Sequence, residues 1–180
     1  LHLGINIAHI HGGERSGTVD EPVRHAISKL STFHLVATQI SADRLIKMGE
    51  ISESVFVTGA PGIDDVKWHV SLQKCELFEG STLEPAKKTA LFVFHPVVGE
   101  EHELSQQTTV IIDACLNHGL QMVIGLPNSD SGGNLIRDAI HNHSEAASFW
   151  IFQHFDRHTY LSWLHHADFI IGNSSSGIIE

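Results

Sequence analysis

The chain has 180 residues, of which 42% are hydrophobic and 18% are charged, and this composition is typical of globular proteins rather than disordered ones. No apolar run reaches the roughly 18 residues that a membrane-spanning helix needs, so the sequence predicts a soluble protein. Its formal net charge of −10 argues against nucleic acid and anionic membranes as partners, because both need a basic surface.

The cysteine content points to a reducing compartment. Cys75 and Cys115 are the two cysteines, and their spacing fits neither a disulfide framework nor a zinc finger. We therefore expect a cytoplasmic protein without a structural metal. Histidines are frequent, and those scattered along the chain, such as His34 and His118, are expected to lie on the surface or in helices.

Short apolar runs alternate with helical patterns along the whole chain. The runs that predict strands span 5–10, 33–40, 54–60, 90–96, 121–128, 148–155 and 167–174. The segments with apolar residues at three- and four-residue spacing, which predict helices, span 21–31, 41–50, 103–119, 133–143 and 157–167. This alternation predicts an α/β fold with parallel sheets and helices on both faces.

The rhythm breaks between Asp64 and Lys88, where Lys/Glu-rich sequence, Gly80 and Pro85 interrupt the pattern. We therefore predict one Rossmann-like domain over 1–66, a linker over 67–89 and a second Rossmann-like domain over 90–180. Both domains are expected to be incomplete, the first at its start and the second at its end.

The first candidate site is the glycine-rich loop after the first expected strand. Ligands of open α/β sheets bind beyond the carboxyl ends of strands, which is where His11 and Glu14 stand. Asp20 has two readings, a helix-initiating carboxylate or a catalytic group. Arg24 either orients a carboxylate or phosphate, or pairs with Asp20 one helical turn away.

Three further strand ends carry polar side chains. His95 follows four apolar residues and either points into a crevice or is a solvated strand-end histidine, and Asn128 either lines a site or forms a turn. The last strand runs into Ser174, Ser175 and Ser176 before a helical pattern. Serines at a helix start are good N-caps, but three of them followed by glycine favour an anion site for a phosphate.

Five segments resemble hydrolysing UDP-N-acetylglucosamine 2-epimerases in order and spacing, and the resemblance covers essentially the whole chain. They are HIHGGERSGTVDEPVRHAISKLSTFHLVAT, VFVTGAPGIDDV, FHPVVGEE, LPNSDSGG and HHADFIIGNSSSGIIE. The resemblance implies the GT-B architecture, in which two Rossmann-like domains face each other across a cleft. The second domain of that architecture holds most of the nucleotide, and the first supplies most of the chemistry.

Carried over residue by residue, the resemblance implies two groups of site residues. The catalytic group is His11, Glu14, Asp20 and Arg24. The UDP-binding group is His95, Asn128, Ser174, Ser175, Ser176 and Glu180, the last of which would hold the ribose. Many relatives have a catalytic glutamate where this chain has His11; a histidine can also transfer protons near neutral pH.

The implied reaction converts UDP-N-acetylglucosamine and water to N-acetylmannosamine and UDP through a glycal, and it supplies sialic-acid synthesis. A UDP-2,4-diacetamido sugar is the alternative substrate, because His11 could mark a different sugar. A non-catalytic nucleotide-sugar-binding fragment is the alternative from another class. We expect no cofactor, no metal, a UDP-sugar as the small-molecule partner, and a homo-oligomer, either dimer or tetramer.

Overall fold

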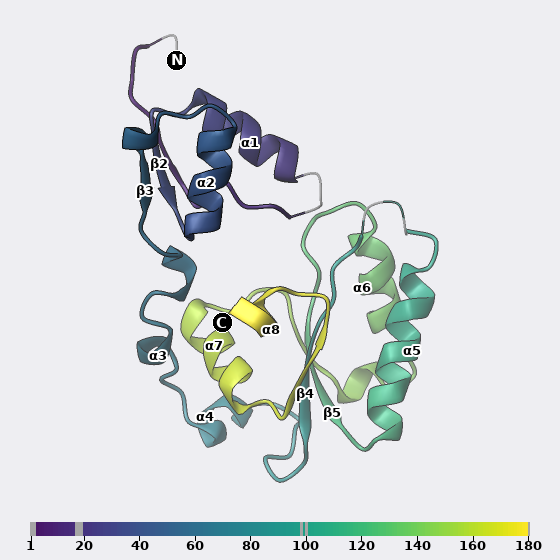
Figure 1. Ribbon diagram of the computed structural model, residues 1–180. Coiled ribbons are helices and arrows are strands. Elements are labelled where there is room, and N and C mark those ends of the chain that lie inside the picture. The colour runs from purple at the N-terminus through teal and green to yellow at the C-terminus, as the bar shows by residue number, and fades with distance from the viewer. Residues whose placement is uncertain (1–2, 17–19, 98, 100, 180) are drawn as a thin grey trace. The chain divides into compact units, whose positions relative to one another are not determined.

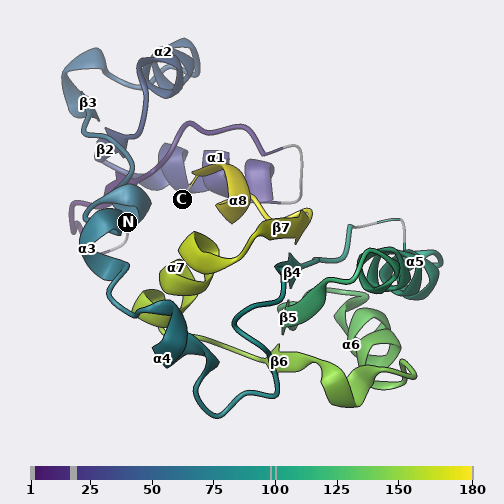
Figure 2. The ribbon, with the colours of Figure 1, turned by 90° about the horizontal axis from the view of Figure 1, so that it is seen from below.

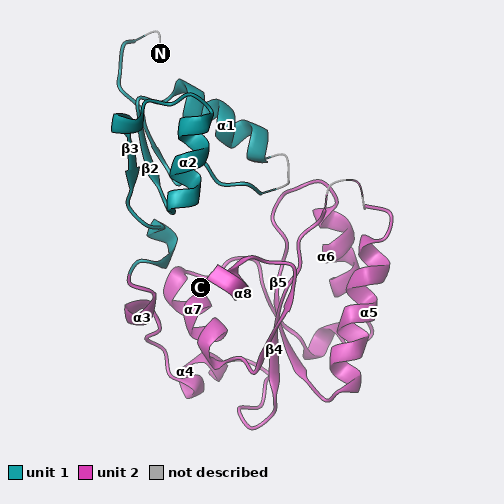
Figure 3. Cartoon of the chain, in the orientation of Figure 1, with its two compact units in different colours: residues 1–64 teal, residues 65–180 magenta. Residues whose placement is uncertain are grey.

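The computed structural model describes residues 3–16, 20–97, 99 and 101–179. These residues form two compact units, Leu1–Asp64 and Asp65–Glu180 (Figure 3). No helix in the described ranges is long and apolar enough to cross a membrane.

The first unit is a small parallel sheet with two helices (Figure 1). Its elements are β1 (Ala8–Ile10), α1 (Asp20–Leu30), β2 (Phe33–Val36), α2 (Gln39–Lys47), a 3-10 turn (Ser52–Ser54) and β3 (Val55–Val57). The sheet order is β1-β2-β3, and both crossovers run in the same direction. Because such crossovers are right-handed, α1 and α2 cover the same face of the sheet. The buried core on that face consists of Val36, Ala42 and Leu45.

The segment 67–89, which we predicted as a linker, contains nearly all of α3 (Val66–His69) and the whole of α4 (Lys74–Phe78), and a 3-10 turn (Pro61–Ile63) precedes it. Both helices contact α7 (Arg157–His166) of the second unit. Leu77 and Phe78 of α4 pack with Trp163 in one of that unit's two apolar cores. In the structure, residues of this stretch therefore contribute to the second unit's core.

The second unit has a four-stranded parallel sheet in the order β6-β5-β4-β7. Its strands are β4 (Thr89–Val93), β5 (Gln121–Gly125), β6 (Trp150–Phe152) and β7 (Phe169–Gly172). Its helices are α5 (Leu104–Asn117), α6 (Gly133–His141), α7 (Arg157–His166) and α8 (Ser176–Ile179), with a 3-10 turn at Ala146–Ser148. Every residue of β4 is buried, as expected for a central strand covered on both faces.

The direction of strand addition reverses beside β4. From β4 the chain adds β5 and then β6 on one side, after which β7 returns to the other side of β4. Consequently α5 and α6 cover one face of the sheet and α7 covers the opposite face (Figure 2). Such a reversal opens a crevice beyond the carboxyl ends of the two strands concerned, here β4 and β7.

Each predicted strand and helix has a counterpart in the structure, but the observed strands are shorter than the predicted runs. We predicted that the strand after α1 continues to Ile40, but β2 ends at Val36 and α2 begins at Gln39. The reason is local, since the Thr38 hydroxyl accepts a hydrogen bond from the backbone N–H of Ser41 at 3.2 Å and caps the helix.

Candidate functional site

The loop after β1 is held close to the sheet of the first unit. The backbone N–H of His11 donates to the carbonyl of Leu35 at 2.7 Å and prolongs the β1–β2 pairing. His11 is exposed and has a φ of 64°. Gly12 and Gly13 are buried, and a Cβ on Gly13 would lie 2.6 Å from the backbone oxygen of Ser41. Only glycine fits there, because that φ is also positive, at 76°.

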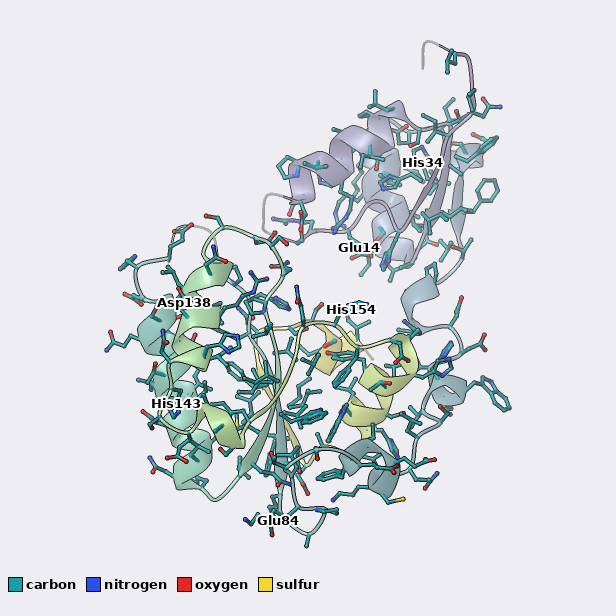
Figure 4. The ribbon with its side chains drawn as sticks, turned by 180° about the vertical axis from the view of Figure 1, so that it is seen from behind. Glu14, His34, Glu84, Asp138, His143 and His154 are labelled. Carbon is teal, nitrogen blue, oxygen red and sulfur yellow. The ribbon has the colours of Figure 1, made fainter. Side chains whose placement is uncertain are left out.

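Glu14 is anchored by the start of α2. The Ser41 hydroxyl donates to Oε1 of Glu14 at 2.7 Å, and the Arg44 guanidinium donates to the carbonyl of Gly13. Glu14 is half-buried, and Figure 4 shows it where the loop leaves β1. Its carboxylate therefore has a fixed position while keeping some access to solvent.

The same loop is tied to the first turn of α1. The backbone N–H of Ser16 donates to Oε2 of Glu21 at 3.2 Å, and Arg15 pairs with the same carboxylate at 3.6 Å. Asp20 opens α1 at an exposed position, and Arg24 follows one turn later, half-buried. The first unit thus carries all four predicted catalytic residues, His11 and Glu14 on the loop and Asp20 and Arg24 on the helix that follows it.

Two histidines lie between the sheet and α1. His9 of β1 shares a hydrogen bond with the Ser28 hydroxyl at 3.0 Å, and burial lowers the pKa of His9, with smaller contributions from His34 and Arg24. His34 is 1% exposed and lies 3.3 Å from Glu50. The expectation that His34 is a surface residue is therefore wrong. It sits in β2 on the side covered by the helices, because side chains of a strand alternate between faces.

In the second unit the crevice beside β4 contains a pocket of about 440 Å³. Its lining residues come from the ends of β4, β6 and β7 and from the start of α7, and they are Val93, His95, Phe152, Gln153, His154, Phe155, Arg157, Tyr160 and Ser174. Figure 4 shows His154 in the stretch that leads from β6 to α7. Two predicted UDP-binding residues, His95 and Ser174, are thus brought together from positions far apart in the sequence.

One wall of this pocket is aromatic and another carries hydroxyl groups. The rings of Phe152 and Phe155 stack with their centroids 3.8 Å apart. The Tyr160 hydroxyl lies 2.5 Å from that of Ser176, which lies 2.9 Å from that of Ser174. Ser175 turns the chain into α8, where its carbonyl accepts the backbone N–H groups of Ile178 and Ile179. An apolar wall beside polar donors suits a ligand with a planar ring and an anionic group.

The environment of His95 favours the neutral form of its imidazole. Burial lowers its pKa, and Asp130 acts in the opposite direction with a smaller effect. Its Nδ1 is buried and has no hydrogen-bond partner within the described ranges. A buried ring nitrogen without a partner is costly, so a ligand that offers a hydrogen bond there would be favoured.

Asn128 forms a turn and does not line this pocket. Its amide donates to Asp130 at 2.6 Å, and its Oδ1 accepts the Asp130 backbone N–H at 3.3 Å. Arg137 donates to the carbonyls of Pro127 and Asn128, at 2.8 and 3.2 Å. The turn is therefore well fixed. Glu180, the predicted ribose-binding residue, lies outside the described residues.

The described part of the chain contains no group of three or more His, Cys, Asp or Glu side chains able to hold a metal ion.

A model of the UDP-N-acetylglucosamine 2-epimerase family matches residues 1–180. The chain belongs to this family.

Two relatives in the family are named after different sugar nucleotides. The chain is 45% identical over 180 residues to the UDP-N,N'-diacetylbacillosamine 2-epimerase (hydrolyzing) of Legionella pneumophila, covering 100% of this chain and 48% of that protein. It is 35% identical over 176 residues to the UDP-N-acetylglucosamine 2-epimerase of Neisseria meningitidis, covering 97% and 46%. The chain thus spans about half the length of the curated relatives it matches.

Solved structures support the fold. The UDP-GlcNAc 2-epimerase from Neisseria meningitidis, crystallised with UDP-GlcNAc, superposes with a TM-score of 0.75 at 18% identity, over 96% of this chain and 49% of that one. The S. aureus MnaA structure with UDP gives a TM-score of 0.72 at 19% identity, over 96% and 47%. This likeness confirms the predicted fold class, an α/β protein of the GT-B type built from Rossmann-like parallel sheets.

The structure adds pocket residues that the sequence analysis overlooked. Phe152, Phe155 and Tyr160 line the pocket beside His95, although among the strand ends of the second unit the one after β6 was not singled out. The signal was present in the sequence as FQHF, where aromatic and polar residues follow an apolar run. Ser41, which holds Glu14, carried no such signal, because its role depends on a contact 27 residues away.

Proposed function

We propose that the protein containing this chain is a hydrolysing 2-epimerase of a UDP-2-acetamido sugar. The observation that carries this proposal is the pocket at the β4–β7 crevice, in which His95 and Ser174 face an aromatic wall. This pocket has the chemistry that a nucleoside diphosphate needs, and the family match extends over the whole chain. Structures of this fold have been solved with UDP-GlcNAc and with UDP.

In this proposal the second unit binds the nucleotide. The hydroxyls of Ser174 and Ser176, with Ser175 between them, donate hydrogen bonds to the diphosphate, and the imidazole of His95, which lines the same pocket, provides another polar contact. Phe155 and Tyr160 offer flat apolar surface to the base. Asn128 supports the neighbouring turn, and Glu180 binds the ribose hydroxyls. These hydroxyl groups also stabilise the charge that develops on UDP as it departs.

The loop and α1 of the first unit supply the acid and base groups. A base removes the proton at C2 of the sugar while the C1–O bond to UDP breaks, which leaves a glycal. Water then adds at C1, and a proton returns to C2 on the opposite face. Asp20, Glu14 and His11 are the candidates for these transfers, with Arg24 orienting the carboxylate of Asp20 or the diphosphate.

Two substrates compete within this reaction class. UDP-N-acetylglucosamine follows from the sequence resemblance and gives N-acetylmannosamine and UDP. The diacetamido substrate is favoured by the 45% identity to the Legionella protein, compared with 35% to the Neisseria protein. Of the two, we favour the diacetamido sugar nucleotide because the higher identity extends over the whole chain.

NMR of product formation tests the proposal. The full-length protein is incubated separately with UDP-N-acetylglucosamine and with UDP-N,N'-diacetylbacillosamine, and the release of UDP and of the 2-epimerised sugar is followed. We expect turnover of the diacetamido substrate with deuterium from solvent incorporated at C2. Turnover of UDP-N-acetylglucosamine alone would reverse the choice of substrate. UDP binding without any product would instead support the non-catalytic binding module.

We also propose a cytoplasmic location, supported by two free cysteines, one exposed and one buried. The homo-oligomer stays a prediction, which a mass measurement in solution can decide.

A further inference from the structure

The side chain of Asn173 continues the pairing of β4 and β7 after their backbones part. The ladder between these strands ends at Val93 and Gly172. One residue further, Nδ2 of Asn173 donates to the carbonyl of His95 at 2.9 Å, and its Oδ1 accepts the backbone N–H of His95 at 2.8 Å. The amide thus gives the backbone N–H and C=O of His95 the two hydrogen bonds that a neighbouring strand would otherwise supply.

A side chain takes over here because the crevice lies between these two strand ends. The chain leaves β4 toward α5 on one face of the sheet and leaves β7 toward α8, so backbone pairing stops. Gly172 lies directly against Val93: its φ is 137°, and an added Cβ would collide with the Val93 carbonyl oxygen. Asn173 then satisfies the polar backbone groups of His95 that would otherwise lack a strand partner.

Asn173 connects two residues that line the pocket. His95 is its hydrogen-bond partner, and Ser174 is its neighbour in the chain; both line the 440 Å³ pocket. We infer that Asn173 is a positioning residue, whose amide sets the distance between the imidazole of His95 and the hydroxyls of Ser174 and Ser176. This inference rests on the proposed function in that the pocket is taken to bind UDP.

The opposite end of the same strand pair offers a matched control. There Oδ2 of Asp168 accepts the backbone N–H of Thr89 at 2.8 Å, so a side chain again closes the β4–β7 ladder. Asp168 stands before β7, at the end remote from the pocket. Removing either side chain costs strand-pairing hydrogen bonds, but only Asn173 touches the backbone of a pocket residue.

The test compares Asn173→Ala and Asp168→Ala in the full-length protein. Isothermal titration calorimetry measures the affinity for UDP, and urea unfolding measures stability. An NMR pH titration of the His95 imidazole without ligand measures its pKa. For Asn173→Ala we expect UDP affinity to fall roughly tenfold, because a displaced His95 would lose one strong hydrogen bond to UDP. The pKa of His95 should rise toward its usual value, because the imidazole is less buried. Asp168→Ala should lower stability while leaving UDP affinity and the His95 titration unchanged.

The inference is overturned if Asn173→Ala leaves both the pKa of His95 and the affinity for UDP as in the parent protein. It is also overturned if Asp168→Ala changes both quantities as much as Asn173→Ala does. Should Asn173→Ala fail to fold, Asn173→Asp and Asn173→Gln are compared. Asn173→Asp shifts the pKa of His95 and repels a diphosphate by charge alone, whereas Asn173→Gln keeps the amide and adds no charge but has a longer side chain. Asn173→Gln is therefore the deciding variant and is expected to show the same two changes. If the parent protein does not bind UDP, the proposed function fails, and the ligand-free titration of His95 still tests the inference.

Discussion

Asp20 illustrates how one carboxylate can serve a helix, a reaction or both. An acidic residue in the first turn of α1 is favoured by the helix dipole, and an exposed carboxylate beside the loop suits proton transfer. These two roles respond differently to removal of charge. A dipole contribution of about 0.3–1 kcal/mol affects folding, whereas loss of an acid or base costs about 10²–10⁴ in rate.

Asp20→Asn should therefore abolish most of the turnover while leaving UDP affinity nearly intact. The amide has almost the same shape but cannot exchange a proton at neutral pH. Product formation by NMR and UDP titration measure the two effects. Asp43→Asn, an exposed change on α2, is the control and should leave both unaffected. Full turnover by Asp20→Asn would assign Asp20 to the helix alone.

His95 should make stability fall at acid pH. Burial lowers its pKa in the folded protein below the usual 6.5, so the unfolded chain binds more protons once the pH drops below that value. The free energy of unfolding is then undiminished above about pH 7 and declines as the pH falls through 6.5 toward the folded pKa.

Urea unfolding of the parent and of His95→Gln at pH 7.5 and pH 5.5 measures this decline. Other histidines contribute to both proteins, so the informative quantity is the difference between the two pH dependences. His95→Gln should lose less stability on acidification than the parent. Equal losses would show that His95 titrates alike in the folded and unfolded states.

At the scale of an element, the loop after β1 depends on a glycine that packs against α2. A Cβ on Gly13 would press on the backbone of Ser41, whose hydroxyl holds Glu14. Gly4 provides the matched control, because it has a similar positive φ of 66° but nothing within 4 Å of an added Cβ.

Gly4→Ala should cost only the strain of a left-handed alanine, about 1–2 kcal/mol. Gly13→Ala should cost the same strain and about 1–3 kcal/mol more from overpacking, and it should slow turnover by displacing Glu14. Chemical unfolding followed by circular dichroism measures the stabilities. Equal costs for the two substitutions would mean that α2 moves freely away from the loop.

The elements themselves could be predicted because each strand shows as an apolar run. β4 is buried on both faces, so all its central residues are apolar, and the pattern is unambiguous. The end of β2 was misplaced because the apolar run was taken to continue to Ile40, whereas the Thr38 cap starts a helix there. His95 and Ser174 could be predicted as site residues from their places after strands. Asn173 could not, because its hydrogen bonds to His95 depend on β7 lying beside β4. The alternation of strands and helices along the sequence does not predict the order of strands in the sheet.

At the scale of the whole molecule, the chain contains separate apolar cores. The first unit has a small core around Val36 and Leu45, and the second has two larger cores on either face of its sheet. Because each unit buries its own apolar residues, each has its own source of stability. The three tryptophans all belong to the second unit, at positions 68, 150 and 163, so tryptophan fluorescence reports the unfolding of that unit alone.

Two fully buried residues, Leu45 in the first unit and Ile124 in the second, therefore test whether the units unfold separately. Replacing either by alanine should cost about 2–5 kcal/mol in the unit that contains it. Ile124→Ala should lower the urea midpoint of tryptophan fluorescence. Leu45→Ala should leave that midpoint in place and instead speed amide hydrogen exchange in β2 and α2, because local stability sets exchange. An equal drop of the fluorescence midpoint in both variants would mean that the 180 residues unfold as one cooperative body.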